Sequence, residues 1–239
     1  MTSIQKPRPV FIAALQREIA GLVHGWRADE TLPGRKIHLY WNDDAVVVCA
    51  GMGADRVKYA VEAALALGPA SELISVGWAG ACIHRLHVGD VFCPDVVVDA
   101  KTGERFLPLK QRSRTEGLEV LVTVAAPAGI AEKERLSTSY FASAVDMEAA
   151  TVGRLAQMRD LPFHAIKAIS DEANFELREM ERFSTPDGQF REAAFGLHVA
   201  TRPALWKPVA AMARGSKLAA QRLQVEIKAH IQQSRNRKS

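Results

Sequence analysis

The chain has 239 residues, of which 48% are hydrophobic and 24% charged, the composition of an ordinary soluble globular protein with one substantial core. No apolar run approaches the roughly 18 residues of a membrane-spanning helix, and no secretory signal precedes the first predicted strand, so we expect a cytoplasmic protein. The net charge of +4 is unevenly placed, because residues 189–239 hold ten Lys and Arg against two Glu, a local balance of +8 that leaves −4 for residues 1–188.

Apolar runs of strand length alternate with helix-forming segments along the first three quarters of the chain. The runs are short and continuous, as in strands buried in a parallel sheet, and turn signals such as Asn42-Asp43-Asp44 separate them. The predicted strands cover residues 9–15, 36–41, 45–50, 72–77, 88–98, 120–124 and 163–169. The predicted helices cover residues 19–26, 54–67, 131–138 and 149–159. This alternation predicts an α/β fold with a mixed central sheet, and the polar residues 100–118 are expected to form a mobile loop.

Residues 140–174 predict a strand, a helix and a second strand, with a carboxylate after each strand. Glu148 follows the first strand and Asp171 the second, and Leu161-Pro162 ends the helix because proline cannot continue it. Two parallel strands joined by a right-handed crossover would bring their carboxyl ends together, at the edge where open α/β sheets bind ligands. Glu148 and Asp171 are therefore expected to line one crevice.

Glu18 follows the strand predicted at residues 9–15 in the same way. Taken singly, an acid in such a position is often a helix-start residue that interacts with the helix dipole. Three acids that converge on one edge fit cleavage of a glycosidic bond, in which one acid protonates the departing group and another activates the nucleophile. These roles require separate pKa values, one raised by burial and one kept low.

The C-terminal part of the chain is mostly helix-forming and basic, with breaks expected at residues 202–203 and 207–208. Trp206, Val209, Met212 and Leu218 would form an apolar side opposite Lys and Arg, typical of a helix packed on the sheet with a solvated basic face. The alternative is a helix that makes peripheral contact with an anionic membrane, at the inner face of the cell membrane. Nucleic acid is not expected as a partner, because no motif that reads it is present.

The cysteines and histidines predict neither a disulfide framework nor a metal site. Cys49, Cys82 and Cys93 are odd in number and lie in or near apolar strands, so we expect buried free thiols. Cys82, His84, His87 and Cys93 match no standard zinc spacing, and both histidines are expected at the surface.

Five segments carry a family pattern: VFIAALQREIAGL, CAGMGADRV, SVGWAGACIHRLHVGDV, AVDMEAATV and IKAISDEAN. In this order they cover most of residues 9–174, and the chain resembles the nucleoside phosphorylase/nucleosidase superfamily, close in pattern to methylthioadenosine/S-adenosylhomocysteine nucleosidases. The shortened middle region, the VDMEAA wording and the RPALWKP tail are most similar to the hopanoid-associated phosphorylase branch.

The resemblance implies a phosphorylase-like three-layer α/β/α fold and a role for each matched residue. Asp171 would protonate or hydrogen-bond the purine N7, with Ser170 helping to orient it. Glu148 would accept hydrogen bonds from the ribose hydroxyls and Met147 would pack against the sugar, which favours an oxocarbenium-like transition state. Glu18 would activate water or contact the 5′ side of the ribose.

Three positions near this expected site depart from the family pattern. Trp78 follows Gly77 where relatives have serine, and Ser75 replaces an arginine of the phosphorylases, so a conventional phosphate site is weakened. Lys167 stands where nucleosidases often have arginine; it would steady water or phosphate, or else it is a strand-end lysine that reaches solvent. Arg56, after a glycine turn, could also compensate, although a simple tight turn is the preferred interpretation.

The loop expected to bind the base, Ala125-Ala126-Pro127, lacks the aromatic residue that nucleosidases often place there. Adenine recognition would then depend on backbone groups around Ala126 or on an aromatic ring, Phe106 or Trp78. Trp78 equally fits a hydrophobic wall for a bulky 5′ substituent. Gly77, Trp78, Ala126 and Lys167 are therefore expected to contact the substrate, together with Met147 and Glu148.

We predict an enzyme that cleaves the N-glycosidic bond of an adenosine-type purine nucleoside with a large or apolar 5′ group, as in adenosylhopane. Water or phosphate would attack; no metal or redox cofactor is implied, and phosphate would be a co-substrate. The alternative is a non-catalytic nucleoside- or lipid-binding protein in which Trp78 fills the nucleophile pocket. Residues 1–188 would form the catalytic domain and residues 189–239 a helical extension packed on it, and a homodimer or larger homo-oligomer is expected by analogy.

Overall fold

The computed structural model describes residues 6–29, 37–109, 118–176, 195, 198, 201–202 and 206–236. Its strands are β1 (Arg8–Ala13), β2 (Arg27–Asp29), β3 (His38–Trp41), β4 (Val46–Cys49), β5 (Ala70–Ala81), β6 (Val91–Phe92), β7 (Val96–Asp99), β8 (Arg105–Phe106), β9 (Val120–Thr123), β10 (Ala144–Asp146) and β11 (Phe163–Asp171). Its helices are α1 (Gln16–Ile19), α2 (Ala54–Ala66), α3 (Ile130–Tyr140), α4 (Ala149–Gln157) and α7 (Trp206–Asn236).

Within these residues one mixed sheet of eleven strands forms the middle of the molecule. Its main order is β2-β3-β4-β1-β5-β10-β9-β7-β8, and β11 pairs with β5 and β6. The predicted hairpin joins β3 to β4, where the Asn42 side chain accepts hydrogen bonds from the backbone N–H groups of Asp44 and Ala45. The α/β architecture with a mixed central sheet and a C-terminal helix is thus confirmed.

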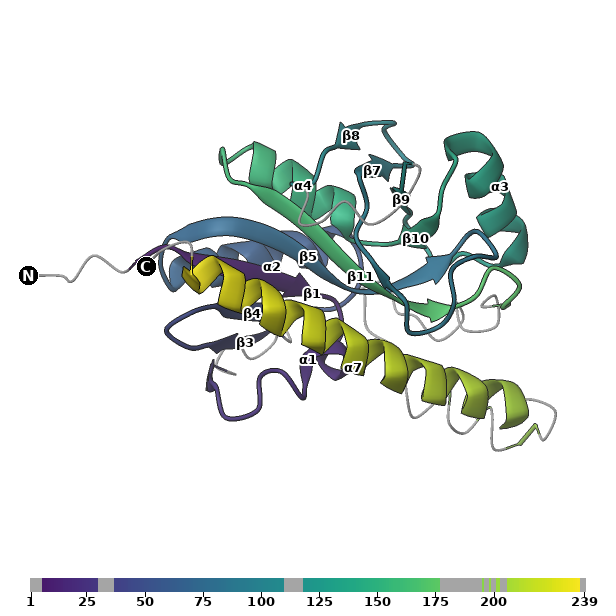
Figure 1. Ribbon diagram of the computed structural model, residues 1–239, viewed down its shortest axis with the longest axis horizontal. Helices are drawn as coiled ribbons and strands as arrows, with labels where there is room; N and C mark the ends of the chain where they lie inside the picture. Colours follow the sequence, from purple (N-terminus) through teal and green to yellow (C-terminus); the bar gives the residue numbers. More distant parts are fainter. Residues whose placement is uncertain are drawn as a thin grey trace, which may run out of the picture.

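Helices cover both faces of the sheet because each inner strand is apolar on both sides. Alternate residues of β1 serve opposite faces: Ile12 packs in the core that holds α2 and α4, and Phe11 packs in the core that holds α7. Figure 1 shows α7 lying across the strands on one side, with α2 behind them. The result is a three-layer α/β/α arrangement.

The long strand β5 decides where the expected site residues meet. The sequence predicts its end at Gly77, but the strand continues through Trp78 to Ala81. β11 runs parallel to β5 while β10 runs antiparallel to it, so the prediction that the strands before Glu148 and Asp171 are parallel is wrong. Their carboxyl ends still meet, because β10 and β11 run in opposite directions along β5 and both end near Gly80: Val145 and Asp171 each pair with this residue.

Several local predictions are corrected by the structure. The helix expected over residues 19–26 is wrong: α1 ends at Ile19 and turns follow, with Gly25 at a φ of 79°. The break expected at residues 207–208 is also wrong, because Pro208 lies in the first turn of α7, where no backbone N–H is needed. Cys93 is exposed rather than buried. The loop expected over residues 100–118 contains β8, and its residues 110–117 lie outside the described part.

Helix α7 packs on the sheet through a different apolar stripe from the one predicted. Ala219, Leu223 and Ile227 are its buried core residues, whereas Trp206 and Leu218 are 56% and 40% exposed. None of the helices described is long and apolar enough to cross a membrane. The predicted domain boundary at residues 188–189 lies outside the described residues.

The C-terminal half of α7 is tied to the sheet by a buried polar cluster. The Ser234 hydroxyl donates a hydrogen bond of 3.0 Å to Glu72, at the start of β5. The ring nitrogens of His164 and His230 lie 2.9 and 3.2 Å from the same carboxylate. Burial opposes ionisation of Glu72, but the two imidazoles outweigh it and lower the pKa of this carboxyl. The cluster therefore fixes the position of α7 relative to β5 and β11.

Candidate active site

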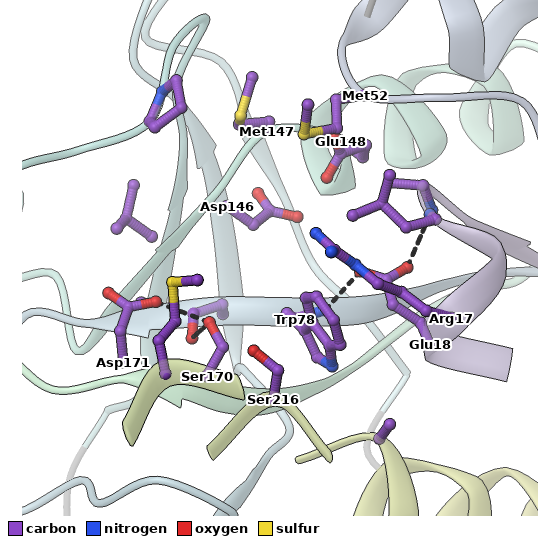
Figure 2. A pocket seen from close by; sticks show the side chains of 18 of the residues that line it. Arg17, Glu18, Met52, Trp78, Asp146, Met147, Glu148, Ser170, Asp171 and Ser216 are labelled. Atoms are coloured by element: carbon purple, nitrogen blue, oxygen red, sulfur yellow. Dashed lines mark hydrogen bonds between the residues drawn. The ribbon is translucent and has the colours of Figure 1, made fainter. Parts of the chain in front are cut away.

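A cavity of about 930 Å³ opens at the end of β5, between the sheet and α7. Figure 2 shows its side chains pointing inward from α1, β5, the β10–α4 junction, the end of β11 and α7. Most of the predicted site residues line it, namely Glu18, Trp78, Ala126, Met147, Glu148, Ser170 and Asp171. Gly77 and Lys167 do not line it, although both contact residues that do, and Arg56 is not among the lining residues.

Glu18 is held rigidly at the start of α1. Its carboxylate accepts hydrogen bonds from the backbone N–H groups of Ala14 and Leu15, at 3.2 and 3.0 Å, and from that of Trp78 at 3.2 Å. Burial raises the pKa of Glu18, although these hydrogen bonds and nearby cations act against the shift. Gly77 gives this carboxylate room: its φ is 140°, and a Cβ there would lie 3.1 Å from Glu18 Oε2.

Lys167 forms the centre of a buried charge cluster beneath the cavity. Its side chain is 0% exposed, so the alternative of a lysine that reaches solvent is wrong, and its Nζ lies 2.9 Å from Asp146 Oδ2. Burial alone would lower the pKa of Lys167, but the carboxylates of Asp146, Glu148 and Glu18 outweigh it and raise the pKa. We call Lys167, Asp146, Glu148 and Glu18 the lysine-167 cluster.

Asp146 is a member of this cluster that the sequence analysis did not select. Its Oδ1 accepts a hydrogen bond of 2.6 Å from the Thr123 hydroxyl, and its Oδ2 accepts one of 2.9 Å from the Ala149 N–H at the start of α4. The signal in the sequence was its spacing of two residues from Glu148, which in an extended segment places both side chains on one side.

Glu148 lies at the N-cap position of α4 and faces the cavity. Burial, together with the charge of Asp146, raises its pKa to about 7, and Lys167 acts in the opposite direction. The Gly53 backbone N–H donates a hydrogen bond of 3.0 Å to Glu148 Oε1. The glycine turn before α2 is thereby engaged with a carboxylate, in keeping with the preferred interpretation of a structural turn.

Asp171 ends β11 and is held on both carboxyl oxygens. The Ser170 hydroxyl donates a hydrogen bond of 2.6 Å to Oδ1, and Lys133 Nζ lies 2.5 Å from Oδ2. Lys133 comes from the first turn of α3 and also lines the cavity; its sequence context predicts no role for it. A Cβ at Gly80 would lie 2.8 Å from Asp171 Oδ2 and 3.1 Å from Lys133 Cε, so only glycine leaves space for this pair.

Trp78 forms the wall of the cavity beside Glu18. The Arg17 guanidinium carbon lies over the indole ring, 4.9 Å from its centroid, as Figure 2 shows. The other aromatic residue proposed for base binding is elsewhere: Phe106 is buried on β8 against Gly153 of α4, so its predicted contact with adenine is wrong. Trp78 is the predicted aromatic residue that the cavity contains.

One group of side chains in the described residues has the spacing of metal ligands, and it lies away from the cavity. Glu72, His164 and His230 offer ligand atoms within 4.8 Å of one another. Glu72 is at the opposite end of β5 from Trp78 and Gly80. The ionisable side chains that line the cavity include those of Glu18, Asp146, Glu148, Asp171 and Lys133.

The sequence matches the family model of the phosphorylase superfamily over residues 11–128 and 120–197. Among solved structures, the 5′-methylthioadenosine nucleosidase of Arabidopsis thaliana is similar, with a TM-score of 0.68 and 17% identity over 95% of this chain and 96% of that one. Futalosine hydrolase of Helicobacter pylori gives 0.67 and 16% over 95% and 98%.

A third similar structure is a 5′-methylthioadenosine/S-adenosylhomocysteine nucleosidase from Neisseria meningitidis bound to methylthio-immucillin-A, with a TM-score of 0.66 and 19% identity over 96% of this chain and 100% of that one. None of the curated proteins matches the chain. Structural similarity at 16–19% sequence identity shows a shared fold and no more. The family model, in contrast, matches more than half of the residues of the chain. The chain belongs to the phosphorylase superfamily.

Proposed function

We propose that this protein hydrolyses the N-glycosidic bond of an adenosine-type purine nucleoside that carries a large apolar 5′ substituent. The observation that carries the proposal is the convergence of Glu18, Glu148 and Asp171 on one cavity, from three different elements. Glycosidic cleavage needs carboxyl groups on both sides of the bond that breaks, and a superfamily of N-glycosyl-cleaving enzymes supplies the precedent.

Glu148 and Met147 are the proposed sugar-binding residues. Ionised, Glu148 accepts hydrogen bonds from the ribose hydroxyls, and its charge stabilises the positive charge that develops on the sugar as the bond breaks. Its position is fixed by the Gly53 N–H and by the charge of Lys167. Met147 packs against the sugar face and keeps the ring in one orientation.

Water is the proposed nucleophile, with Glu18 as the base. Burial raises the pKa of Glu18, which makes its carboxylate a stronger base than an exposed glutamate. A phosphate ion in the same position would face this carboxylate, and the charge of Lys167 is already shared among the acids of its cluster. Ser75, which replaces the arginine of phosphorylases, is fully buried and does not line the cavity.

Asp171 is the proposed donor of the proton that the purine N7 takes up. An adenine anion is a poor leaving group, so neutralising it as the bond breaks lowers the barrier. Ser170 orients the carboxyl group toward the cavity through its hydrogen bond. Ala126 and Pro127 form the neighbouring wall, where backbone groups can contact the base.

The wall contributed by α7 supports a large apolar 5′ group. Val209, Met212 and Ala213 line the cavity there, together with Phe195. The volume of about 930 Å³ lies at the upper end of the roughly 300–1,000 Å³ typical of ligand pockets, more than a bare nucleoside requires. Together with the resemblance to the hopanoid-associated branch, this makes adenosylhopane the specific substrate that we propose.

Peripheral membrane contact of α7 is part of this proposal, because a lipid-linked substrate resides in a membrane. Trp206 is exposed, as are five basic residues of the helix: Arg214, Lys217, Arg222, Lys228 and Arg235. Such a surface binds anionic lipid headgroups. Co-sedimentation with anionic vesicles that is unchanged by Trp206→Ala and by neutral substitution of these basic residues would exclude this contact.

A homo-oligomer also remains a prediction.

The test is adenine release from adenosine, methylthioadenosine and an adenosyl-lipid, each with and without phosphate. We expect release that does not need phosphate, fastest with the adenosyl-lipid, and loss of turnover in Asp171→Asn with folding retained. Release only with phosphate would replace hydrolysis by phosphorolysis. Binding without turnover in the unmodified protein and in Asp171→Asn alike would instead support a nucleoside- or lipid-binding protein in which Trp78 fills the nucleophile pocket. Trp78 and Glu18 both line the cavity, and the Trp78 backbone N–H donates a hydrogen bond to Glu18.

A further inference from the structure

Lys133 is a buried lysine whose ammonium group faces the carboxyl group proposed to protonate the base. It is 1% exposed, and its Nζ lies 2.5 Å from Asp171 Oδ2. It also donates a hydrogen bond of 2.8 Å to the Glu172 carbonyl oxygen. Lysine is rarely buried so completely without a functional or structural reason, because desolvation of the charge is costly.

Both carboxyl oxygens of Asp171 lie within hydrogen-bond distance of a donor, an arrangement that an ionised carboxylate can satisfy. Oδ1 accepts from the Ser170 hydroxyl and Oδ2 accepts from the Lys133 ammonium. A protonated carboxyl group would have an O–H to donate, whereas an ionised one only accepts. An ionised Asp171 held in this way has no proton of its own to give to a leaving purine, whereas the Lys133 ammonium beside Oδ2 has one.

From this geometry we propose that Lys133 is a positioning residue that loads Asp171 with the proton for the purine; the inference rests on the proposed cleavage of a purine nucleoside. As the C1′–N9 bond breaks, its electron pair moves into the purine, and N7 takes the proton from Asp171 Oδ2. Lys133 passes a proton to Oδ2 and becomes a neutral amine.

The remaining atoms balance at the other end of the cavity. The oxygen of water forms the new bond to C1′, and the proton of that water goes to Glu18. Transfer of this proton to solvent and uptake of one by Lys133 restore the starting state. Base and sugar product leave, with one water consumed and no other reactant required.

The backbone is built to permit the contact between Lys133 and Asp171. Gly80 on β5 lies directly beneath the pair, and any Cβ there would come within 2.8 Å of the carboxylate oxygen. The α3 helix places Lys133 in its first turn, where the helix dipole disfavours a cation. The ion pair and the carbonyl of Glu172 offset that unfavourable position.

The test compares two substrates that share a sugar but differ in how much their leaving groups need a proton. An adenosine-type nucleoside needs one, whereas the 4-nitrophenyl riboside releases a stable anion without one. We expect Lys133→Met to lower kcat/KM for the nucleoside by about 100-fold or more, the range of general acid catalysis, and for the nitrophenyl riboside by less than about tenfold.

Lys133→Arg separates proton supply from charge pairing. Arginine keeps the positive charge but does not give up a proton in proteins. We therefore expect this variant to retain cleavage of the nitrophenyl riboside and to lose nucleoside cleavage as Lys133→Met does, and it keeps the test available if the methionine variant fails to fold. Lys58→Met, an exposed lysine on α2, is the matched control and should leave both rates unchanged.

Two outcomes would overturn the proposal. One is full nucleoside activity in Lys133→Arg, which would reduce the role of Lys133 to its charge. The other is an equal loss with both substrates in both variants, which would mean a structural role. Failure of the proposed function is distinguishable, because the unmodified protein would then release no base from any nucleoside.

Discussion

Lys167→Met removes the one cation at the centre of the lysine-167 cluster and should be among the most destabilising single changes in the described part of the chain. Both partners of its ion pair are inaccessible, with Lys167 and the Asp146 side chain each 0% exposed and 2.9 Å apart. Removing one member of a buried pair typically costs about 3–5 kcal/mol, because the other charge stays buried without compensation. We expect a loss of this size in the free energy of unfolding at neutral pH.

The pH dependence of that loss has a definite sign. Glu148 and Glu18 already have raised pKa values because of burial, and Lys167 limits both shifts. In Lys167→Met, the carboxyl groups of the cluster will hold their protons to higher pH. At a pH where they are neutral, no unpaired charge is buried, so the variant is then less destabilised relative to the unmodified protein. The deficit should therefore be smaller at about pH 5 than at about pH 8.

Urea unfolding at several pH values measures this directly, with Lys58→Met as an exposed control and Asp146→Asn for a double-mutant cycle. The double variant should be less destabilised than the sum of its single variants, because it leaves fewer charges unpaired. A loss below about 1 kcal/mol at every pH, the value of an exposed ion pair, would refute the interpretation of Lys167 as a buried counter-ion.

Three further changes test other parts of the site and the fold. Glu148→Gln should lower kcat/KM by about 100-fold. It should also stabilise the fold relative to the unmodified protein, by up to about 3 kcal/mol more above pH 7 than at pH 4.5, because ionising a carboxyl whose pKa is raised to about 7 costs stability between these pH values. Urea unfolding of both proteins at the two pH values measures this difference. Gly77→Ala should destabilise by about 1–3 kcal/mol in thermal unfolding and slow base release, because its φ of 140° is strained for alanine and the new Cβ meets Glu18. Glu72→Gln should destabilise the fold by about 1–3 kcal/mol at neutral pH. Because the pKa of Glu72 is lowered from 4.5, the difference in unfolding free energy between the variant and the unmodified protein, measured in urea, should shrink as the pH falls below 4.5.

The inner strands were predictable because continuous apolar runs are typical of buried strands. The short strands β2 and β8 were not predicted, and the single strand predicted over residues 88–98 is divided into β6 and β7, which pair with different strands. The other errors lie where tertiary contacts override local signals. The sequence pattern predicts a strand that ends at Gly77, but β5 continues past it. The absence of a side chain at Gly77 leaves space for the Glu18 carboxylate instead. The helix predicted after Glu18 stops early, where Gly21 is packed against the side chain of Gln224 from α7. No pattern within either segment contains that information.

The carboxylates of the site were predictable from their positions after strands, whereas the groups that tune them were not. Lys133 is 38 residues from Asp171 in the chain, and no local motif links the two. Its one local signal is a cation in the first turn of a helix, against the dipole. Lys167 was selected from the resemblance, but its burial could be known only once β5, β10 and β11 were assembled around it.

The carboxylates at the two ends of the cavity lie beside different lysines. The register of β11 against β5 determines the distance between these two ends. Lys167 pairs across from Gly77 and serves Glu18 and Glu148, while Asp171, with Lys133, pairs across from Gly80. Three residues of strand separate these positions, roughly 10 Å. Because acid and base need opposite environments, an enzyme that protonates a base at one end and activates water at the other benefits from two independent cations. Glycine at two positions of β5, Gly77 beside Glu18 and Gly80 beside Asp171, leaves each carboxylate space next to its own lysine.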